Sequence, residues 1–312
     1  MTSPHLKDYL QLHFIVFIWG FTAILGELIT SISRFELVFY RTLIAFLGLV
    51  VLFFYKKRSF QVSKKNLIKY LLTGGIIAVH WILFFLAMRV STVSICLIGL
   101  ATASLWTSLL EPIFYRKRPQ LLDVLLGLLI LGGLYIVSSA ELHYALGLLL
   151  GVISALLGAL FSVLNAQFIK KQHHYTITLY EMLGACLASA CFLPFYWFNP
   201  INPQKIQLLP NYTEWFYLLI LALVCTVYAY AASVKLMKKF TAFAVNLTVN
   251  LEPIYGMILA FFFFPERERQ LSPSFYIGAV IIMIAVFSYP TLKKLLRKRN
   301  KTTPLKAVEV SN

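Results

Sequence analysis

The chain has 312 residues, of which 60% are hydrophobic and only 13% are charged, and its mean hydropathy is +0.79. This composition excludes a water-soluble globular domain. The formal net charge of +16 does not indicate a nucleic-acid partner, because the basic residues lie in short connections between hydrophobic segments and not in one basic domain.

Ten hydrophobic segments, each of about 20 residues, predict transmembrane helices. In chain order they are 12–32, 37–55, 67–88, 92–115, 121–139, 144–169, 175–198, 213–234, 240–264 and 273–290. The expected fold is therefore an all-α integral membrane protein, with the lipid bilayer as its environment. We expect a multi-pass protein of the cell (cytoplasmic) membrane.

The basic residues predict the orientation of these segments. The connections on the side of both termini hold 22 Lys and Arg residues, whereas the opposite connections hold 5. Because positive residues mark the cytoplasmic side, both termini are expected in the cytoplasm. The basic tail, residues 292–312, is then a determinant of topology.

The ten segments divide into two halves, residues 1–139 and 140–291. Since each half has an odd number of segments, the second half must enter the membrane from the opposite side, which predicts the inverted repeats common in transporters. Tyr40-Arg41 resembles Tyr180-Glu181, and Gly127 corresponds to Gly278. The first pair is 140 positions apart and the second is 151 positions apart, and the longer loop after the seventh segment accounts for most of the difference. Residues in the ninth segment, which follows that loop, are therefore expected about 149 positions after their counterparts in the fourth.

One tetrapeptide, Leu-Glu-Pro-Ile, occurs at 110–113 and again at 251–254. Its spacing of 141 does not match the expected 149, so the two glutamates are not equivalent. Glu111 lies close to the basic cluster at 116–118 and is expected near the inner membrane surface. Glu252 is expected near the midplane, and its counterpart in the first half is Ala103.

Glu252 is the strongest candidate for function, because a carboxylate inside a membrane usually faces a cavity, a partner or an ion path. Tyr255 is expected on the same helical face, and Asn246 and Asn250 on nearly the opposite face. Pro253 leaves the carbonyl of Val249 without its usual helical donor. The alternative is a carboxylate that only ties helices together.

Aromatic and polar residues in other segments complete the expected site, because such walls suit small amphipathic solutes. The candidate cavity residues are Trp19, His80, Trp106, Asn246, Asn250, Glu252 and Tyr255. Glu27 and Arg41 are expected at similar depth, as a local salt bridge or an outer gate. The four cysteines lack metal-ligand spacing, so no metal and no cofactor are expected.

Small residues recur every four positions in the sixth segment, at Gly147, Gly151, Ala155 and Ala159. Such a stripe permits close helix contact. Packing inside the molecule is the expected use, and the face of a homodimer is the alternative.

The sequence resembles the EamA family of drug/metabolite transporters. The residues that carry the resemblance are Trp19-Gly20-Phe21-Thr22, Arg41, Glu252-Pro253 and Glu266, and the first half departs from it with Lys117 where the second has Glu266. The resemblance implies ten helices in two inverted five-helix halves, a central cavity, and export or exchange of small metabolites, including amino acids.

These observations predict a secondary transporter that works by alternating access. The sequence has no phosphate-binding loop for a nucleotide, so an ion or solute gradient is the expected energy source, and Glu252 is the candidate for proton coupling. A passive facilitator and a non-transporting scaffold are the alternatives. The chain is not expected to be an enzyme, because it has no Asp inside a segment and no His-Glu-x-x-His or Gly-x-Ser-x-Gly motif.

Overall fold

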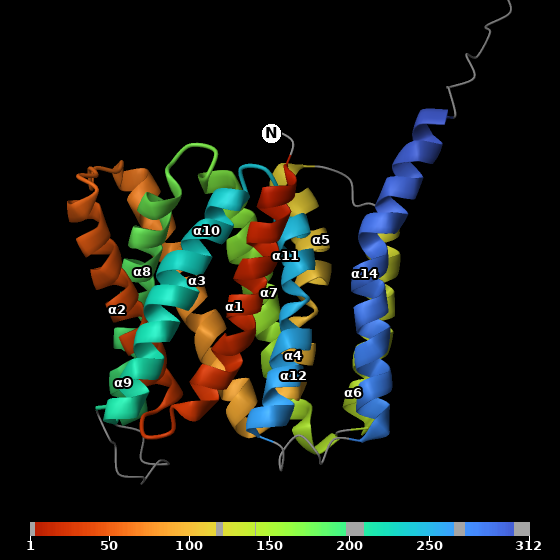
Figure 1. Cartoon of the computed structure of the whole chain (residues 1–312), viewed down its shortest axis with the longest axis horizontal. Helices are drawn as coiled ribbons and strands as arrows, with labels where there is room; N and C mark the ends of the chain where they lie inside the picture. The colour runs from red at the N-terminus through yellow and green to blue at the C-terminus, as the bar shows by residue number, and fades with distance from the viewer. Residues whose placement is uncertain (1–3, 117–120, 141, 198–208, 265–271, 303–312) are drawn as a thin grey trace, which may run out of the picture.

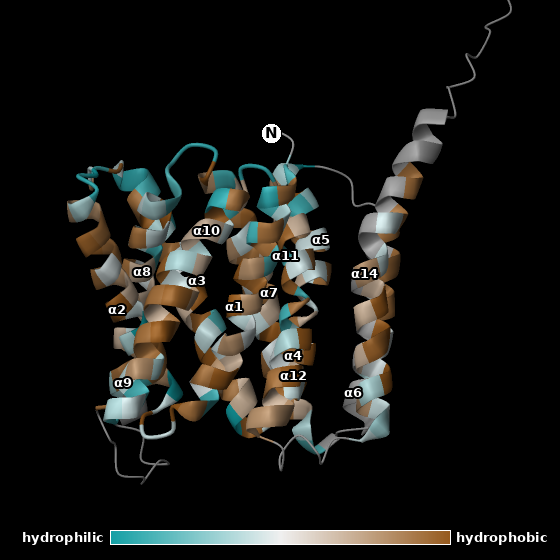
Figure 2. Cartoon of the chain, viewed as in Figure 1, coloured by the Kyte–Doolittle hydropathy of each residue, from teal (hydrophilic) through white to brown (hydrophobic). Residues whose placement is uncertain are grey.

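The computed structural model describes residues 4–116, 121–140, 142–197, 209–264 and 272–302. Within these ranges the chain forms helices and no β-strand. Eight described segments are long and apolar enough to cross a membrane. They stand side by side as a bundle (Figure 1), with hydrophobic residues along the helices and hydrophilic residues concentrated at the ends (Figure 2).

The elements in chain order are α1 (Leu6–Leu28), α2 (Arg34–Tyr55), α3 (Lys64–Val90), α4 (Val93–Leu100), α5 (Ala103–Tyr115), α6 (Leu121–Ala140), the 3-10 turn η1 (Leu142–Tyr144), α7 (Ala145–Phe168), α8 (His174–Trp197), α9 (Tyr212–Leu219), the π-helical segment η2 (Ile220–Tyr228), α10 (Ala229–Leu236), α11 (Ala242–Val249), α12 (Glu252–Phe263) and α14 (Pro273–Thr302).

Eight of the expected segments coincide with the eight membrane-length segments, and the remaining two, 121–139 and 273–290, fall in α6 and α14. The count of ten spans stays a prediction. The last helix continues to Thr302, so the predicted basic tail begins as helix, and residues 303–312 lie outside the described part. Lys117 and Glu266 also lie outside it.

Side-chain caps determine where several helices begin. Ser33 Oγ accepts a hydrogen bond from the Glu36 amide, and Glu36 accepts one from the Ser33 amide at 2.7 Å, which forms a capping box at the start of α2. Glu214 forms the same box at the start of α9 and also accepts the Thr30 and Ser31 amides at 2.8 and 2.9 Å. This carboxylate therefore fastens the α1–α2 connection to the second half of the chain.

The fourth and ninth segments are each broken into two helices. Thr92 caps α4 by accepting the Ile95 amide at 3.2 Å, and Thr241 caps α11 by accepting the Ala244 amide at 3.1 Å. The starts of α4 and α11 are 149 residues apart, and so are the starts of α5 and α12. This spacing equals the one expected from the sequence, so the two broken helices correspond to each other.

The two breaks have different chemical causes. At Asn250–Leu251 the break precedes Pro253, which lacks an amide hydrogen for Val249. At Ala101–Thr102 there is no proline, and the Thr102 hydroxyl donates to the Gly99 carbonyl at 2.7 Å. Broken helices at membrane depth require enclosure by protein or a polar cavity. Here α4 packs against α12, and α5 packs against α11.

The small-residue stripe of α7 is used inside the molecule. A side chain added at Gly147 would meet Ser91 at 2.2 Å, and one added at Gly151 would meet the Cys96 carbonyl at 2.9 Å. Ala155 and Ala159 are fully buried. The expected internal packing is confirmed, and the alternative that this stripe forms a dimer face is wrong.

A close backbone contact between α3 and α8 gives a test of stability. A Cβ atom at Gly74 would lie 2.1 Å from the Glu181 carbonyl oxygen, whereas one at Gly75 would lie 3.9 Å from Ala188. We expect Gly74→Ala to force α3 and α8 apart and to cost about 1–3 kcal/mol. Gly75→Ala, the matched control, is expected to be neutral or stabilising because alanine favours a helix interior.

Thermal unfolding of the two variants in detergent measures this difference. The expected result is a melting temperature several degrees lower for Gly74→Ala than for Gly75→Ala. Equal melting temperatures would show that α3 and α8 are not in this close contact.

Candidate functional site

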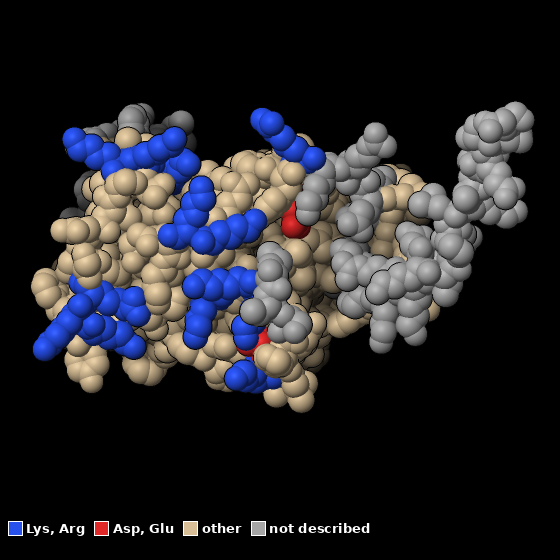
Figure 3. All heavy atoms as spheres, turned by 90° about the horizontal axis from the view of Figure 1, so that it is seen from above, with Lys and Arg blue, Asp and Glu red and all other residues tan. Residues whose placement is uncertain are grey.

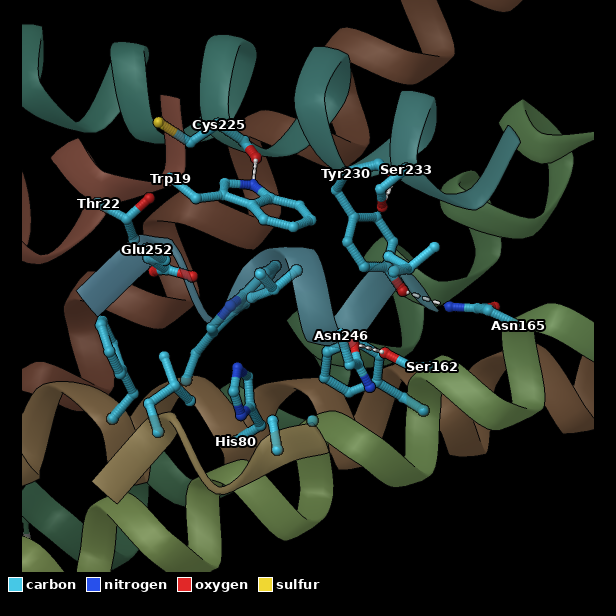
Figure 4. Close-up of a pocket in the computed structure, with 18 of the residues that line it drawn as sticks. Trp19, Thr22, His80, Ser162, Asn165, Cys225, Tyr230, Ser233, Asn246 and Glu252 are labelled. Atoms are coloured by element: carbon cyan, nitrogen blue, oxygen red, sulfur yellow. Dashed lines mark hydrogen bonds between the residues drawn. The ribbon is translucent and has the colours of Figure 1, made fainter. Parts of the chain in front are cut away.

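A cavity lies inside the bundle (Figure 4). Its walls come from both halves of the chain. The residues that line it are Trp19, Thr22, Arg41, His80, Trp81, Phe84, Leu100, Ala103, Gly158, Phe161, Ser162, Asn165, Cys225, Tyr230, Ser233, Met237, Val245, Asn246, Val249 and Glu252.

Four of the seven candidate cavity residues lie at this wall: Trp19, His80, Asn246 and Glu252. The other three, Trp106, Asn250 and Tyr255, are not among the residues that line this cavity.

Each of the three has another position. Tyr255 faces α1, where its ring packs edge to face on Phe17 with centroids 5.5 Å apart. Asn250 Nδ2 donates to Ser104 Oγ at 2.7 Å and so joins the two helix breaks. Trp106 is half-buried and packs against the main hydrophobic core.

Glu252 is the first residue of α12 and is 6% exposed. The helix N-terminus carries a partial positive charge that favours an anion there. Within the described part of the chain, its carboxylate has no hydrogen bond and no ion pair, and its electrostatic partner is Arg41. Figure 4 shows the carboxylate next to Thr22 at the cavity. It is therefore available to a bound solute.

Arg41 brings the opposite charge to the cavity. It is 1% exposed, its guanidinium lies 3.9 Å from the centre of the Trp81 ring, and its Nε donates to Thr226 Oγ1 at 3.0 Å. Its Nη1 is buried without a hydrogen-bond partner among the described residues. Stacking on an aromatic ring favours arginine over lysine, and the free Nη1 is a donor for an anionic group.

The expected pairing of Glu27 with Arg41 is wrong. Glu27 forms a salt bridge of 3.0 Å with Arg34, whose Nη1 also donates to the carbonyls of Gly26 and Ile29. Arg34 begins α2 and therefore meets the end of α1, whereas Arg41 lies two turns deeper and faces inward. The predicted outer gate of Glu27 and Arg41 is not formed.

The remaining polar residues of the wall are held by neighbouring helices. His80 Nδ1 lies 2.7 Å from the Ser154 carbonyl, and the Ser154 hydroxyl donates to the His80 carbonyl at 2.9 Å. Asn246 Nδ2 donates to Thr107 Oγ1 at 2.7 Å, while its Oδ1 accepts from Ser162 at 3.1 Å. These bonds hold the wall in place. They use one N–H of the Asn246 side-chain nitrogen and one acceptor position of its oxygen, so each atom can form one further hydrogen bond.

The π-helical segment η2 shapes the wall opposite these residues. The Thr226 hydroxyl donates to the Leu221 carbonyl at 2.8 Å, and the Cys225 carbonyl accepts from Trp19 Nε1 at 3.0 Å. Because Thr226 also holds Arg41, this segment positions both Trp19 and the cation. Segments of π-helix are frequent at functional sites, and no feature of the sequence predicted this one.

A second carboxylate, Glu181 on α8, is fully buried in the protein. It accepts a hydrogen bond from the Tyr230 hydroxyl at 2.9 Å, and Tyr230 lines the cavity. Neither Glu181 nor Tyr230 is among the site residues predicted from the sequence. The signal available was the absence of any basic residue within one helical turn of Glu181.

Two matched broken helices around a polar cavity, inside a bundle of apolar helices, are characteristic of membrane transport proteins. The sequence model of the EamA-like transporter family matches residues 8–139 and again residues 145–289. The chain belongs to this family and is built from two of its repeats, which confirms the resemblance seen in the sequence.

Relatives span nearly the whole chain. An uncharacterized transporter of Archaeoglobus fulgidus is 25% identical and covers 90% of this chain and 96% of its own length. One from Haemophilus influenzae is 22% identical, with coverage of 90% and 94%. One from Bacillus subtilis is 24% identical, with coverage of 88% and 86%. A protein with a solved crystal structure matches with a TM-score of 0.68 at 15% identity, covering 92% of this chain and 98% of its own, which shows a shared fold.

Proposed function

We propose that the protein is a secondary transporter that exports or exchanges small zwitterionic metabolites, such as amino acids, across the cytoplasmic membrane. The observation that carries the proposal is one cavity that holds two unsatisfied and opposite charges. Among the described residues, Arg41 offers a buried Nη1 without a hydrogen bond, and Glu252 offers a carboxylate without one.

A zwitterionic solute supplies a partner for each charge. Its carboxylate matches the Arg41 guanidinium, and its ammonium group matches the Glu252 carboxylate. The aromatic residues Trp19, Trp81 and Phe161 in the same wall suit an apolar side chain on the solute.

Alternating access is supported by the position of the cavity between the broken helices. Ala103, at the start of α5, and Glu252, at the start of α12, both line it. Short half-helices can change their packing while the long helices beside them stay intact. Opening the bundle first at one end and then at the other would then release the solute on the opposite side.

The cytoplasmic location of both termini is supported by the charge on one end of the bundle. Lys and Arg side chains gather on the end where the N-terminus lies (Figure 3). The connections that contain Lys56, Lys170 and Lys238 reach this end (Figure 1). By the positive-inside rule this is the cytoplasmic end.

Proteoliposomes containing the purified protein test the function. The panel comprises amino acids, their carboxamides, sugars and cationic drugs, each measured by counterflow and by net flux with and without a pH gradient. We expect counterflow of at least one amino acid and little of its carboxamide, which has lost the anionic group. Flux of none of these solutes would favour a non-transporting scaffold, and flux that never responds to a gradient would favour a passive facilitator.

A further inference from the structure

The network around Glu181 lies beside the cavity and contains more hydrogen-bond acceptors than donors can satisfy. Glu181 Oε2 accepts from the Tyr230 hydroxyl at 2.9 Å, and the Tyr230 oxygen accepts from Asn165 Nδ2 at 2.7 Å. Glu181 Oε1 and Asn165 Oδ1 are both buried and have no hydrogen-bond partner in the described part of the chain. We call these three residues the Glu181 cluster.

The cluster also has no positive charge to balance the carboxylate. The titratable groups that face Glu181 are Tyr230 from α10 and Tyr70 from α3. From α7 it meets the neutral Asn165, and α2, which also packs against α8, adds no charged group to the cluster among the described residues. An ionised carboxylate with one hydrogen bond and no cation is costly in a dry interior, and a bound proton removes that cost.

Besides the carboxylate itself, the Glu181 cluster offers the Tyr230 hydroxyl and Asn165 Oδ1 as oxygen ligands. A metal cation would need several further oxygen ligands, whereas a proton needs one. The chemistry of the Glu181 cluster therefore fits a proton.

We propose that Glu181 is a second proton-binding site, distinct from Glu252, which is loaded and unloaded during the transport cycle. Tyr230 links this site to the cavity, because its hydroxyl donates to Glu181 while the residue forms part of the cavity wall. A solute that moves Tyr230 removes a hydrogen bond that stabilises ionised Glu181. Proton binding and solute binding must then affect each other equally. This coupling rests on the proposed transport function, but the proton site does not.

The position of the cluster indicates the side from which the proton comes. Tyr230 lies five residues before Lys235, and Asn165 lies five residues before Lys170. At a rise of about 1.5 Å per residue, both are about 8 Å from the basic end of the bundle. Glu181 is therefore expected to exchange its proton with that end.

Infrared difference spectroscopy of the purified protein without solute tests the proton site. We expect a protonated-carboxylic-acid band that is lost as the pH is raised, is absent from Glu181→Gln, and remains in Glu252→Gln. Tyr230→Phe keeps the ring and loses the donor, so the band should persist to pH values higher by about one unit or more. Survival of the band in Glu181→Gln, or its loss when sodium is added at constant pH, would overturn the proposal.

The coupling is tested by proton release or uptake when an accepted solute is added to weakly buffered protein. The wild type should exchange protons on binding, and Glu181→Gln should bind the solute while exchanging at most about half as many. Unchanged exchange in Glu181→Gln would refute the coupling. If the wild type transports no solute in the panel, the proposed function fails while the infrared result still decides the proton site.

Discussion

Replacing Arg41 with glutamine is expected to reduce the transport efficiency for a zwitterionic solute by about 100-fold or more, because the solute carboxylate loses its charged partner in a buried site. Arg41→Lys keeps the charge but loses the planar stack on Trp81 and the Nε bond to Thr226. It should therefore be intermediate, with a loss of about tenfold.

The measurement is concentration-dependent counterflow of an amino acid and of its carboxamide. Wild-type protein should discriminate strongly between the two, and Arg41→Gln should transport both equally poorly. Arg34→Gln is the control, since Arg34 is also buried but pairs with Glu27 outside the cavity. If Arg41→Gln retained the preference for the carboxylate, Arg41 would not be the anion-binding residue.

Replacing Glu252 with glutamine is expected to abolish the response of transport to an imposed pH gradient. The carboxylate lies at the cavity without a hydrogen bond to any described residue, so it can bind a proton or a solute ammonium group but not both at once. Glutamine keeps the shape, but it cannot bind a proton and offers the ammonium group no negative charge. We also expect about a tenfold or larger loss of affinity for zwitterionic solutes.

Glu111→Gln is the matched control, because Glu111 belongs to the other copy of the same tetrapeptide. Its carboxylate accepts the Phe243 amide at 3.2 Å near the start of α11 and does not line the cavity. The Glu111 variant should keep the pH response. A Glu252→Gln protein with full transport and an unchanged response to the gradient would remove Glu252 from the coupling mechanism.

The features that could be predicted from the sequence are those that depend on residues close together in the chain. Hydropathy located the eight membrane-length segments because apolar composition over about 20 residues is a local property. The separation of Glu111 from Glu252 also followed from local context, namely a basic cluster beside one and apolar residues around the other. The spacing of 149 between the halves is matched by the two broken helices.

Other features depend on residues far apart in the chain. The break before Pro253 had a visible cause, whereas the break at Ala101–Thr102 is made without a proline. Their similar expected depth in the membrane suggested that Glu27 pairs with Arg41, but Arg34 forms the salt bridge with Glu27 instead. The direction in which Tyr255 points is determined by its contact with α1, which helical periodicity could not reveal.

The correspondence between Ala103 and Glu252 affects the relative free energies of the two end states of transport. Both residues begin the second half of a broken helix, 149 positions apart, and both line the cavity. In a duplicated protein, the two end states can be generated by exchanging the conformations of the repeats. A methyl group and a carboxylate are not interchangeable, so that exchange cannot relate two states of equal free energy. The protein without a bound ligand should therefore populate mostly the end state that opens to one side of the membrane. The free energy that shifts it to the other end state must come from the ligand that the carboxylate binds.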